Sequence, residues 1–363
     1  MVGESTPTIE GRAETPGLGP PAAAPPAKAV GRRRLRRVAT AATLVAGLAW
    51  ALHGVDARTL WAAVKASRPG WLLFAAALNL GAVVLQAARW LALVRPLSPA
   101  ATLGAAFKSM VVGTTVSMFV PARAGELARV DWFSRSTGLP RGQLLGSVLL
   151  DYLINAAGLL LGLGLLPFVL AVPPWIGRGI VLTVALFTVG TLVVVAARPG
   201  TEARSASTGA GFVRRIAAAL SHVRRGLVAT SHPSALAASF TACVASWILE
   251  LDVIAATMKA MGLEMPLAAG LLVLLAVNVA LAFPFAPPAN LGTLEFGASV
   301  ALMGFGVPKE KAVAFGIVYH LLQIVPIMIL GALIAGRGSW RPPADEPSPG
   351  GPRPLKRRGD PTA

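Results

Sequence analysis

Two shortages in the sequence exclude whole classes of protein. Charged residues make up 13% of the 363 residues, whereas soluble domains carry roughly a quarter. The single cysteine, Cys243, excludes a disulfide within one chain and a Cys-based zinc or iron–sulfur site. Nucleotide-binding and hydrolase motifs are also missing. The four histidines show no paired spacing, so we expect no metal and no cofactor.

What the sequence has instead is hydrophobic length. Hydrophobic residues make up 55% of the chain, and the mean hydropathy is +0.66. Apolar runs long enough to cross a membrane occur at about 38–54, 71–94, 101–120, 143–170, 175–197, 235–258, 266–286 and 311–336, with a shorter one at 294–305. These runs predict an all-α polytopic membrane protein.

The charge is strongly positive, with 33 Lys and Arg against 16 Asp and Glu. Such an excess can indicate nucleic-acid binding, but in a membrane protein arginines collect in cytoplasmic loops. We therefore expect no nucleic-acid partner. The tails 1–37 and 337–363 are rich in Pro and basic residues and are predicted to be disordered and cytoplasmic. The basic loop 198–233 is predicted to be cytoplasmic as well.

The number of apolar runs conflicts with this topology. Five runs lie between the N-terminal tail and the basic loop 198–233, but two cytoplasmic ends require an even number of crossings. One run must therefore return to the side from which it enters, and run 101–120 is the best candidate because Pro and Gly break it.

Run 266–286 is followed by a similar break. The predicted helix-break residues are Pro121, Gly125, Pro287, Pro288 and Gly292. The sequence thus predicts about six full transmembrane helices plus two re-entrant helical hairpins, with residues 38–336 as one transmembrane domain.

The two breaks also align with each other. Gly138-Leu-Pro lies seventeen residues after Pro121, and Gly306-Val-Pro lies eighteen residues after Pro288. By the predicted topology the two hairpins enter from opposite sides, so the arrangement is an inverted repeat. Broken helices in inverted repeats are typical of transporters with a substrate site near the middle of the bilayer.

The stretch from Met118 to Arg129, which reads Pro-Ala-Arg-Ala-Gly-Glu-Leu-Ala-Arg after Val120, and the second break from Pro287 to Glu295 resemble the lysylphosphatidylglycerol synthase transmembrane (flippase-like) family. The resemblance covers about residues 38–336 and implies a stand-alone member without the soluble aminoacyltransferase domain. It also implies the inner (cell) membrane of a bacterium, with both termini cytoplasmic. This chain departs from the family at Asp151-Tyr152, where a Glu-Arg pair is typical, and at Tyr319-His320, where an Arg is frequent.

Charged residues inside a membrane are candidates for function because burying a charge there costs about 3 kcal/mol or more. Arg123, Glu126 and Arg129 recur every three residues, so they share a helix face and carry one surplus positive charge, which suits a lipid phosphate. Asp151 is predicted to compensate one of these arginines or to take a proton. A purely structural ion network is the alternative. The other predicted substrate-binding residues are Asn155, Glu250, Asn290, Glu295, His320 and Gln323.

Two further residue expectations follow. His320 is the best candidate for a proton relay because a His titrates near physiological pH, although a packing role is the alternative. Arg89 and Lys108 are expected near cytoplasmic helix ends, with their charges reaching the membrane surface.

The predicted function is a lipid transporter that moves a phospholipid or polyprenyl-phosphate-linked headgroup through a polar cavity between the two repeats. Its partners would be membrane lipids, anionic or phosphate-bearing, and an enzyme that makes the lipid. The alternatives are a membrane enzyme acting on a lipid headgroup, against which no catalytic pair is visible, and a non-catalytic partner subunit.

Overall fold

The computed structural model describes residues 57–119, 124–170, 232–281 and 287–336, with scattered positions between 178 and 189. The predicted runs 38–54 and 175–197, the basic loop 198–233 and both tails lie wholly or largely outside the described residues. The helices are α2 Ala57–Lys65, α3 Pro69–Val94, α4 Leu103–Phe119, α5 Ala124–Thr137, α6 Arg141–Val169, α9 Pro233–Ala260, α10 Leu267–Leu281, the short η2 Pro288–Asn290, α11 Thr293–Met303 and α12 Lys309–Gly336. The described residues contain no strand, so the all-α prediction is confirmed for them.

Four helices are long and apolar enough to cross a membrane: α3, α6, α9 and the Lys309–Ile334 part of α12. Each lies within two residues of the run predicted for it. Proline stands in the first turn of both α3 and α9, where its missing N–H costs no helix bond. The other apolar helices, α4, α10 and α11, are shorter. The protein is therefore a membrane protein with several spanning helices.

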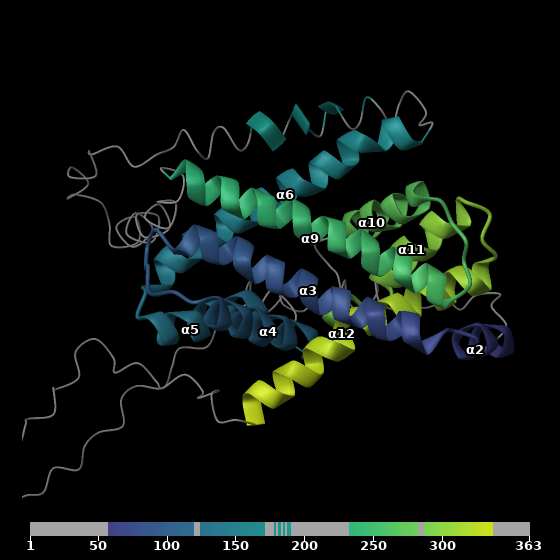
Figure 1. The fold of residues 1–363 in the computed structure, drawn as a ribbon, viewed down its shortest axis with the longest axis horizontal. Coiled ribbons are helices and arrows are strands. Elements are labelled where there is room, and N and C mark those ends of the chain that lie inside the picture. Colours follow the sequence, from purple (N-terminus) through teal and green to yellow (C-terminus); the bar gives the residue numbers. More distant parts are fainter. Residues whose placement is uncertain are drawn as a thin grey trace, which may run out of the picture.

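Helices α3 and α9 form a central antiparallel pair (Figure 1). The N–H of Arg68, just before α3, donates to the carbonyl oxygen of Ala260 at the end of α9, at 2.7 Å. The beginning of one helix therefore lies beside the end of the other. This arrangement places the C-terminal ends of the two helices at opposite ends of the pair.

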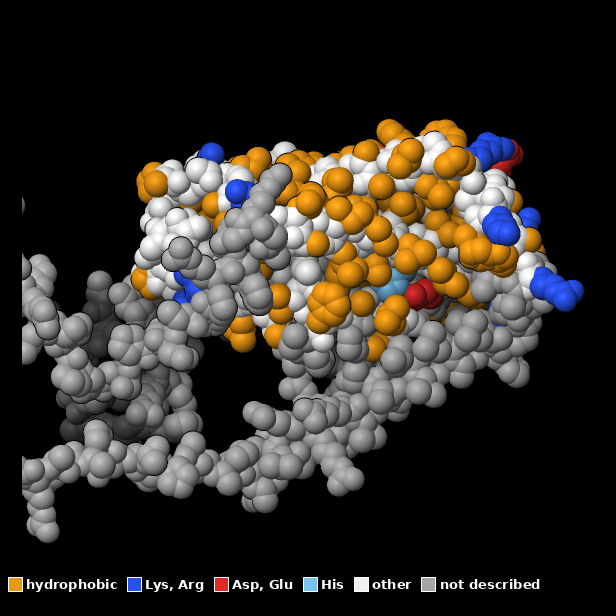
Figure 2. Space-filling model, turned by 90° about the horizontal axis from the view of Figure 1, so that it is seen from below, with side chains coloured by type: hydrophobic (Ala, Val, Ile, Leu, Met, Phe, Trp, Pro, Cys, Tyr) orange, Lys and Arg blue, Asp and Glu red, His pale blue; other side chains and the backbone are white. Residues whose placement is uncertain are grey.

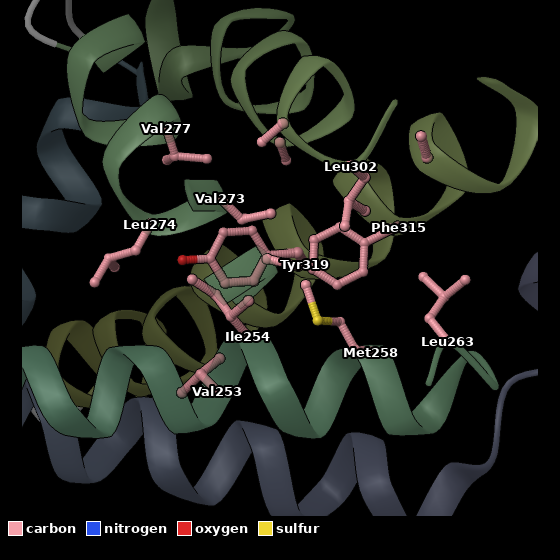
Figure 3. Close-up of a cluster of buried hydrophobic side chains, with 14 of the residues drawn as sticks. Val253, Ile254, Met258, Leu263, Val273, Leu274, Val277, Leu302, Phe315 and Tyr319 are labelled. Carbon is pink, nitrogen blue, oxygen red and sulfur yellow. The ribbon is translucent and has the colours of Figure 1, made fainter. Parts of the chain in front are cut away.

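Each of these ends carries its own apolar cluster. One cluster joins the last turns of α3, including Trp90, to α4, α5 and the start of α6. The other joins the last turns of α9, including Ile254, to α10, α11 and the start of α12. In the second cluster Tyr319 lies among Ile254, Val273 and Phe315 (Figure 3). Helices α4 and α5 thus lie toward one end of the α3–α9 pair, and α10 and α11 toward the other (Figure 1).

Glycine allows the short helices to approach each other closely. A Cβ added at Gly125 of α5 would overlap the carbonyl oxygen of Gly113 and Oγ of Ser117, both on α4. A Cβ at Gly297 of α11 would lie 2.9 Å from the carbonyl oxygen of Ala276 on α10. Small residues at such crossings are typical of membrane helices.

Large hydrophobic side chains cover much of the outer surface. Leu73 is 73% exposed and Phe168 is 85% exposed. In Figure 2, hydrophobic side chains fill the middle of one face, and Lys and Arg side chains lie toward its two ends. An apolar belt between charged ends is the surface that a bilayer requires.

Candidate functional site

The first group of polar residues centres on Asp151 of α6. Its Oδ1 accepts a hydrogen bond from Nε of Arg89 on α3 at 2.8 Å, and its Oδ2 lies 3.3 Å from Nη2 of Arg129 on α5. Arg89 also donates from Nη1 to Oδ1 of Asn155, one turn along α6, at 2.5 Å. All three charged residues are at most 5% exposed. A single carboxylate therefore ties α3, α5 and α6 together.

A more exposed carboxylate adjoins this cluster. Glu126 Oε2 lies 3.5 Å from Nη1 of Arg129, and its Oε1 accepts a hydrogen bond from the hydroxyl of Tyr152 at 2.7 Å. The Glu126 side chain is 30% exposed. Arg129 is also held by Trp90, over whose ring its guanidinium lies at 4.0 Å. We call these residues, Arg89, Glu126, Arg129, Asp151, Asn155 and Tyr152, the Asp151 cluster.

One donor of the Asp151 cluster has no partner within the described part of the chain. Nε of Arg129 is buried and makes no hydrogen bond to the described residues. A buried N–H without an acceptor is costly, of order 1–3 kcal/mol. The site could therefore accept an additional oxygen.

The prediction for Arg89 is wrong. Its charge does not reach the membrane surface, because the residue is 5% exposed and bound to Asp151. Arg89 lies within the apolar run that became α3, and the partner that explains its position is 62 residues away along the chain. Lys108, by contrast, is exposed.

The predicted charge count near the first break also changes. Asp151 is shared by Arg89 and Arg129, and Glu126 lies beside Arg129. Arg123 and Pro121 lie outside the described residues. Among the described residues, two arginines therefore stand against two carboxylates, and the described part of the site carries no surplus charge. The predicted surplus would have to come from Arg123, so it stays a prediction.

The second group lies at the other helix break. Nδ1 of His320 on α12 lies 2.7 Å from Oε1 of Glu295 on α11, and Nε2 lies 2.8 Å from the carbonyl oxygen of Ala289 in η2. Glu295 is 9% exposed and His320 is 3% exposed. His320 therefore connects the break to two helices.

The backbone of this break is unusual. Ala289 has φ 55° and Asn290 has φ 58°, and Gly292 follows with φ 78°. Only Gly adopts positive φ without cost, so the two non-glycine residues require support from their surroundings. Pro287 is buried, and Pro288 begins η2. Asn290 is half-buried, and η2 contacts α4.

A third set of contacts joins α9 to α12. The hydroxyl of Tyr319 donates to Oε1 of Glu250 at 2.5 Å. Nε2 of Gln323 donates to the same carboxylate oxygen and lies 2.9 Å from the Tyr319 hydroxyl. Asn79 of α3 donates to the carbonyl oxygen of Leu322 at 2.9 Å. The structure thus brings Glu250 and Gln323 together, but it separates them from Arg129 and Asp151, which belong to the other half.

Sequence reasoning missed Arg89, Tyr152 and Tyr319 as site residues. The two site tyrosines could have been noticed in the sequence, because they are the only tyrosines of the chain and so rare a residue type attracts attention. Each donates its hydroxyl to a predicted site carboxylate, Tyr152 to Glu126 and Tyr319 to Glu250. Among the described residues, no group of His, Cys, Asp or Glu is placed to hold a metal ion.

The family model for the lysylphosphatidylglycerol synthase TM region matches residues 37–331. The chain belongs to this family. The match confirms the resemblance seen in the two break motifs, and it spans both polar groups described above. A comparison with curated proteins finds no match. The family indicates a membrane protein of lipid metabolism or transport that interacts with membrane lipids.

Proposed function

We propose that this protein moves an anionic, phosphate-bearing lipid across the membrane, as a transporter of the flippase type. The observation that carries the proposal is Arg129, a buried arginine whose Nε–H has no acceptor among the described residues and which lies beside a half-buried Glu126. Arg binds phosphate through several N–H groups at once, and such charge-assisted bonds are about twice as strong as neutral ones. A lipid phosphate would supply the missing acceptor and would balance the positive charge that Arg123 adds.

The arrangement of the two halves supports transport rather than static lipid binding. The antiparallel α3–α9 pair carries one short-helix pair at each end, α4–α5 and α10–α11. Asp151 and Tyr319 each lie thirteen residues after the turn glycine of their half, and each bonds a polar side chain of the central pair, Arg89 or Glu250. We propose that the halves are inverted repeats and that each short-helix pair is a re-entrant hairpin. Alternating access would follow from rocking one half against the other.

The remaining parts of the proposal follow from the sequence. With runs 38–54 and 175–197 as spans, α3, α6, α9 and α12 would bring the total to six, with both termini on the cytoplasmic side of a bacterial inner membrane. The lipid would be supplied by a separate enzyme. Asn155, Glu250, Asn290, Glu295, His320 and Gln323 would line the path of the headgroup together with the Asp151 cluster.

Native mass spectrometry of the protein with anionic and zwitterionic lipids tests the proposal. Arg129→Ala and Arg123→Ala should each abolish the preference for the anionic lipid. Arg129→Lys should restore only part of it, because Lys keeps the charge but lacks the planar fork.

Arg135→Ala is the matched control, since Arg135 lies on the same helix and pairs with Asp131 at a more exposed position. Its lipid preference should equal that of the wild type. Unchanged lipid preference in folded Arg129→Ala and Arg123→Ala proteins would assign the Asp151 cluster to architecture and refute the phosphate-bearing substrate.

A further inference from the structure

The contacts of His320 fix the number of protons that it shares with Glu295. A carbonyl oxygen can only accept, so the 2.8 Å contact to Ala289 requires a hydrogen on Nε2. Nδ1 then lies 2.7 Å from Oε1 of Glu295. Two lone pairs at this distance repel, so one proton lies between these atoms. It can sit on Nδ1, giving an ion pair, or on Oε1, giving two neutral groups; in either case the pair has no net charge.

Removal of that proton would leave the pair unstable. The product is a neutral His320 whose Nδ1 lone pair faces an ionised Glu295. Oε2 of Glu295 is buried and has no hydrogen-bond partner among the described residues, so the carboxylate has no donor to compensate its charge. A buried, unpaired charge is strongly disfavoured. The contact between His320 and Glu295 therefore depends on the proton.

The surrounding helices leave this pair chemically isolated. No other titratable side chain of the described residues is hydrogen-bonded to it, and α10 and η2 carry none. The neighbouring acid Glu250 of α9 is bound by Tyr319 and Gln323. The titratable groups of the other helices packed against α12 are Arg58 and Lys65 of α2, Arg89 of α3, Lys108 of α4, and Asp252 and Lys259 of α9. Arg89 is held by Asp151.

We propose that Glu295 and His320 bind one exchangeable proton and that this proton holds the second helix break against α12. When the proton is bound, His320 is fixed by Glu295 and in turn fixes Ala289, whose positive φ needs such support. When Nδ1–H or Oε1–H gives the proton to water, only that bond breaks, the pair becomes negative, and His320 leaves Glu295. The helix break at 287–292 is then no longer fixed by His320. Because η2 contacts α4, the change reaches the first half of the molecule.

The proposed proton site rests only on the geometry of the His320–Glu295 pair. We further propose that this proton drives lipid movement, and that step rests on the function proposed above. The measurements below require no lipid transport, so failure of the Arg129 experiment and failure of the proton site are distinguishable.

Nitrogen NMR of the full chain in lipid nanodiscs shows directly which ring nitrogens of His320 carry hydrogen. With His53, His222 and His232 replaced by Gln, the remaining ¹⁵N-His signal belongs to His320. We expect Nε2 to stay protonated throughout, while one proton is lost from the pair as the pH is raised. A signal with hydrogen on Nδ1 and none on Nε2, or a pair that keeps its proton at every pH at which the protein stays folded, would overturn the proposal.

The accessibility of the helix break can be measured by the rate of thiol labelling of Asn290→Cys in a Cys243→Ser background. We expect the labelling rate to rise several-fold with pH, after division by the rate at Lys311→Cys, an exposed position that corrects for thiol reactivity. Glu295→Gln should give slow labelling at every pH, because its amide N–H can donate to Nδ1 as protonated Glu would. His320→Ala should give fast labelling at every pH.

Two more variants complete the test. His320→Arg carries a permanent positive charge opposite Glu295, so its labelling should lose the pH dependence. Glu250→Gln removes the neighbouring acid and should retain the wild-type response. If wild-type labelling is independent of pH, or if Glu250→Gln rather than Glu295→Gln removes the dependence, the proton does not act on the break through this pair.

Discussion

The Asp151 side chain connects three helices, α3, α5 and α6. It accepts hydrogen bonds from two buried arginines on two different helices, so its charge is the partner of both. When one member of a buried ion pair is removed, the charge left behind is uncompensated, and the loss is typically 3–5 kcal/mol. The position of the helices therefore depends on this carboxylate, whatever else the cluster binds.

Asp151→Asn is expected to lower the free energy of unfolding in mixed micelles by about 3 kcal/mol or more. Asp131→Asn is the control, because Asp131 also pairs with two arginines but its side chain is 26% exposed. An exposed pair contributes about 0–1 kcal/mol. Equal losses for the two variants would show that burial does not set the strength of the Asp151 cluster.

Sequence reasoning succeeded for residues whose partners are close in the chain. Glu126 and Arg129 are three residues apart, and their proximity follows from helix geometry. The partner of Arg89 lies 62 residues away, and that of Glu250 lies 69 residues away at Tyr319. Such pairings depend on which helices pack together, and hydrophobic periodicity does not encode that choice.

At the scale of elements, the short helices depend on close contact between backbones. Gly297 of α11 leaves no room for a side chain against α10. The bounds of these helices could be predicted because Pro and Gly mark their ends. Their partners could be guessed only from adjacency in sequence, and the structure pairs α4 with α5 and α10 with α11 as that adjacency suggests.

Gly297→Ala is expected to destabilise the protein by about 1–3 kcal/mol, because the added methyl group meets the backbone of Ala276 and Val277, which cannot move aside. Thermal unfolding in detergent measures the change. Gly104→Ala in α4 provides the comparison, since no atom lies within 4 Å of its added Cβ, and helix propensity there favours Ala by up to about 1 kcal/mol. A Gly297→Ala protein as stable as Gly104→Ala would show that the α10–α11 contact is looser than described.

At the scale of the whole molecule, the two apolar clusters at opposite ends of the α3–α9 pair carry the argument for an inverted repeat. The four long helices and the second break at η2 were readable from the sequence. The orientation of one half relative to the other was inferred only from charge and parity, since nothing in a single sequence states on which side a turn lies.

Cysteine labelling from each side of the membrane decides the orientation. The turns near 139 and 307 are expected on the cytoplasmic side and the outer side, respectively. Because Val307 is buried, the exposed neighbours Ser136 and Lys311 are the better positions. In a Cys243→Ser background, a membrane-impermeant reagent applied outside should label Lys311→Cys and spare Ser136→Cys. Labelling of both from one side would contradict the inverted repeat.

The order in which the chain presents the Asp151 cluster has a consequence for its biosynthesis. Arg89 is the only charged residue of α3, and its carboxylate partner comes 62 residues later. At roughly 5–20 residues per second of translation, Asp151 is made about 3–12 s after Arg89. Arg129 also precedes Asp151, by 22 residues. Arg129, however, already has Glu126 three residues before it. The nascent chain therefore exposes one unpaired guanidinium, that of Arg89, until its carboxylate partner is made, and α3 reaches its final position only when α6 enters the membrane.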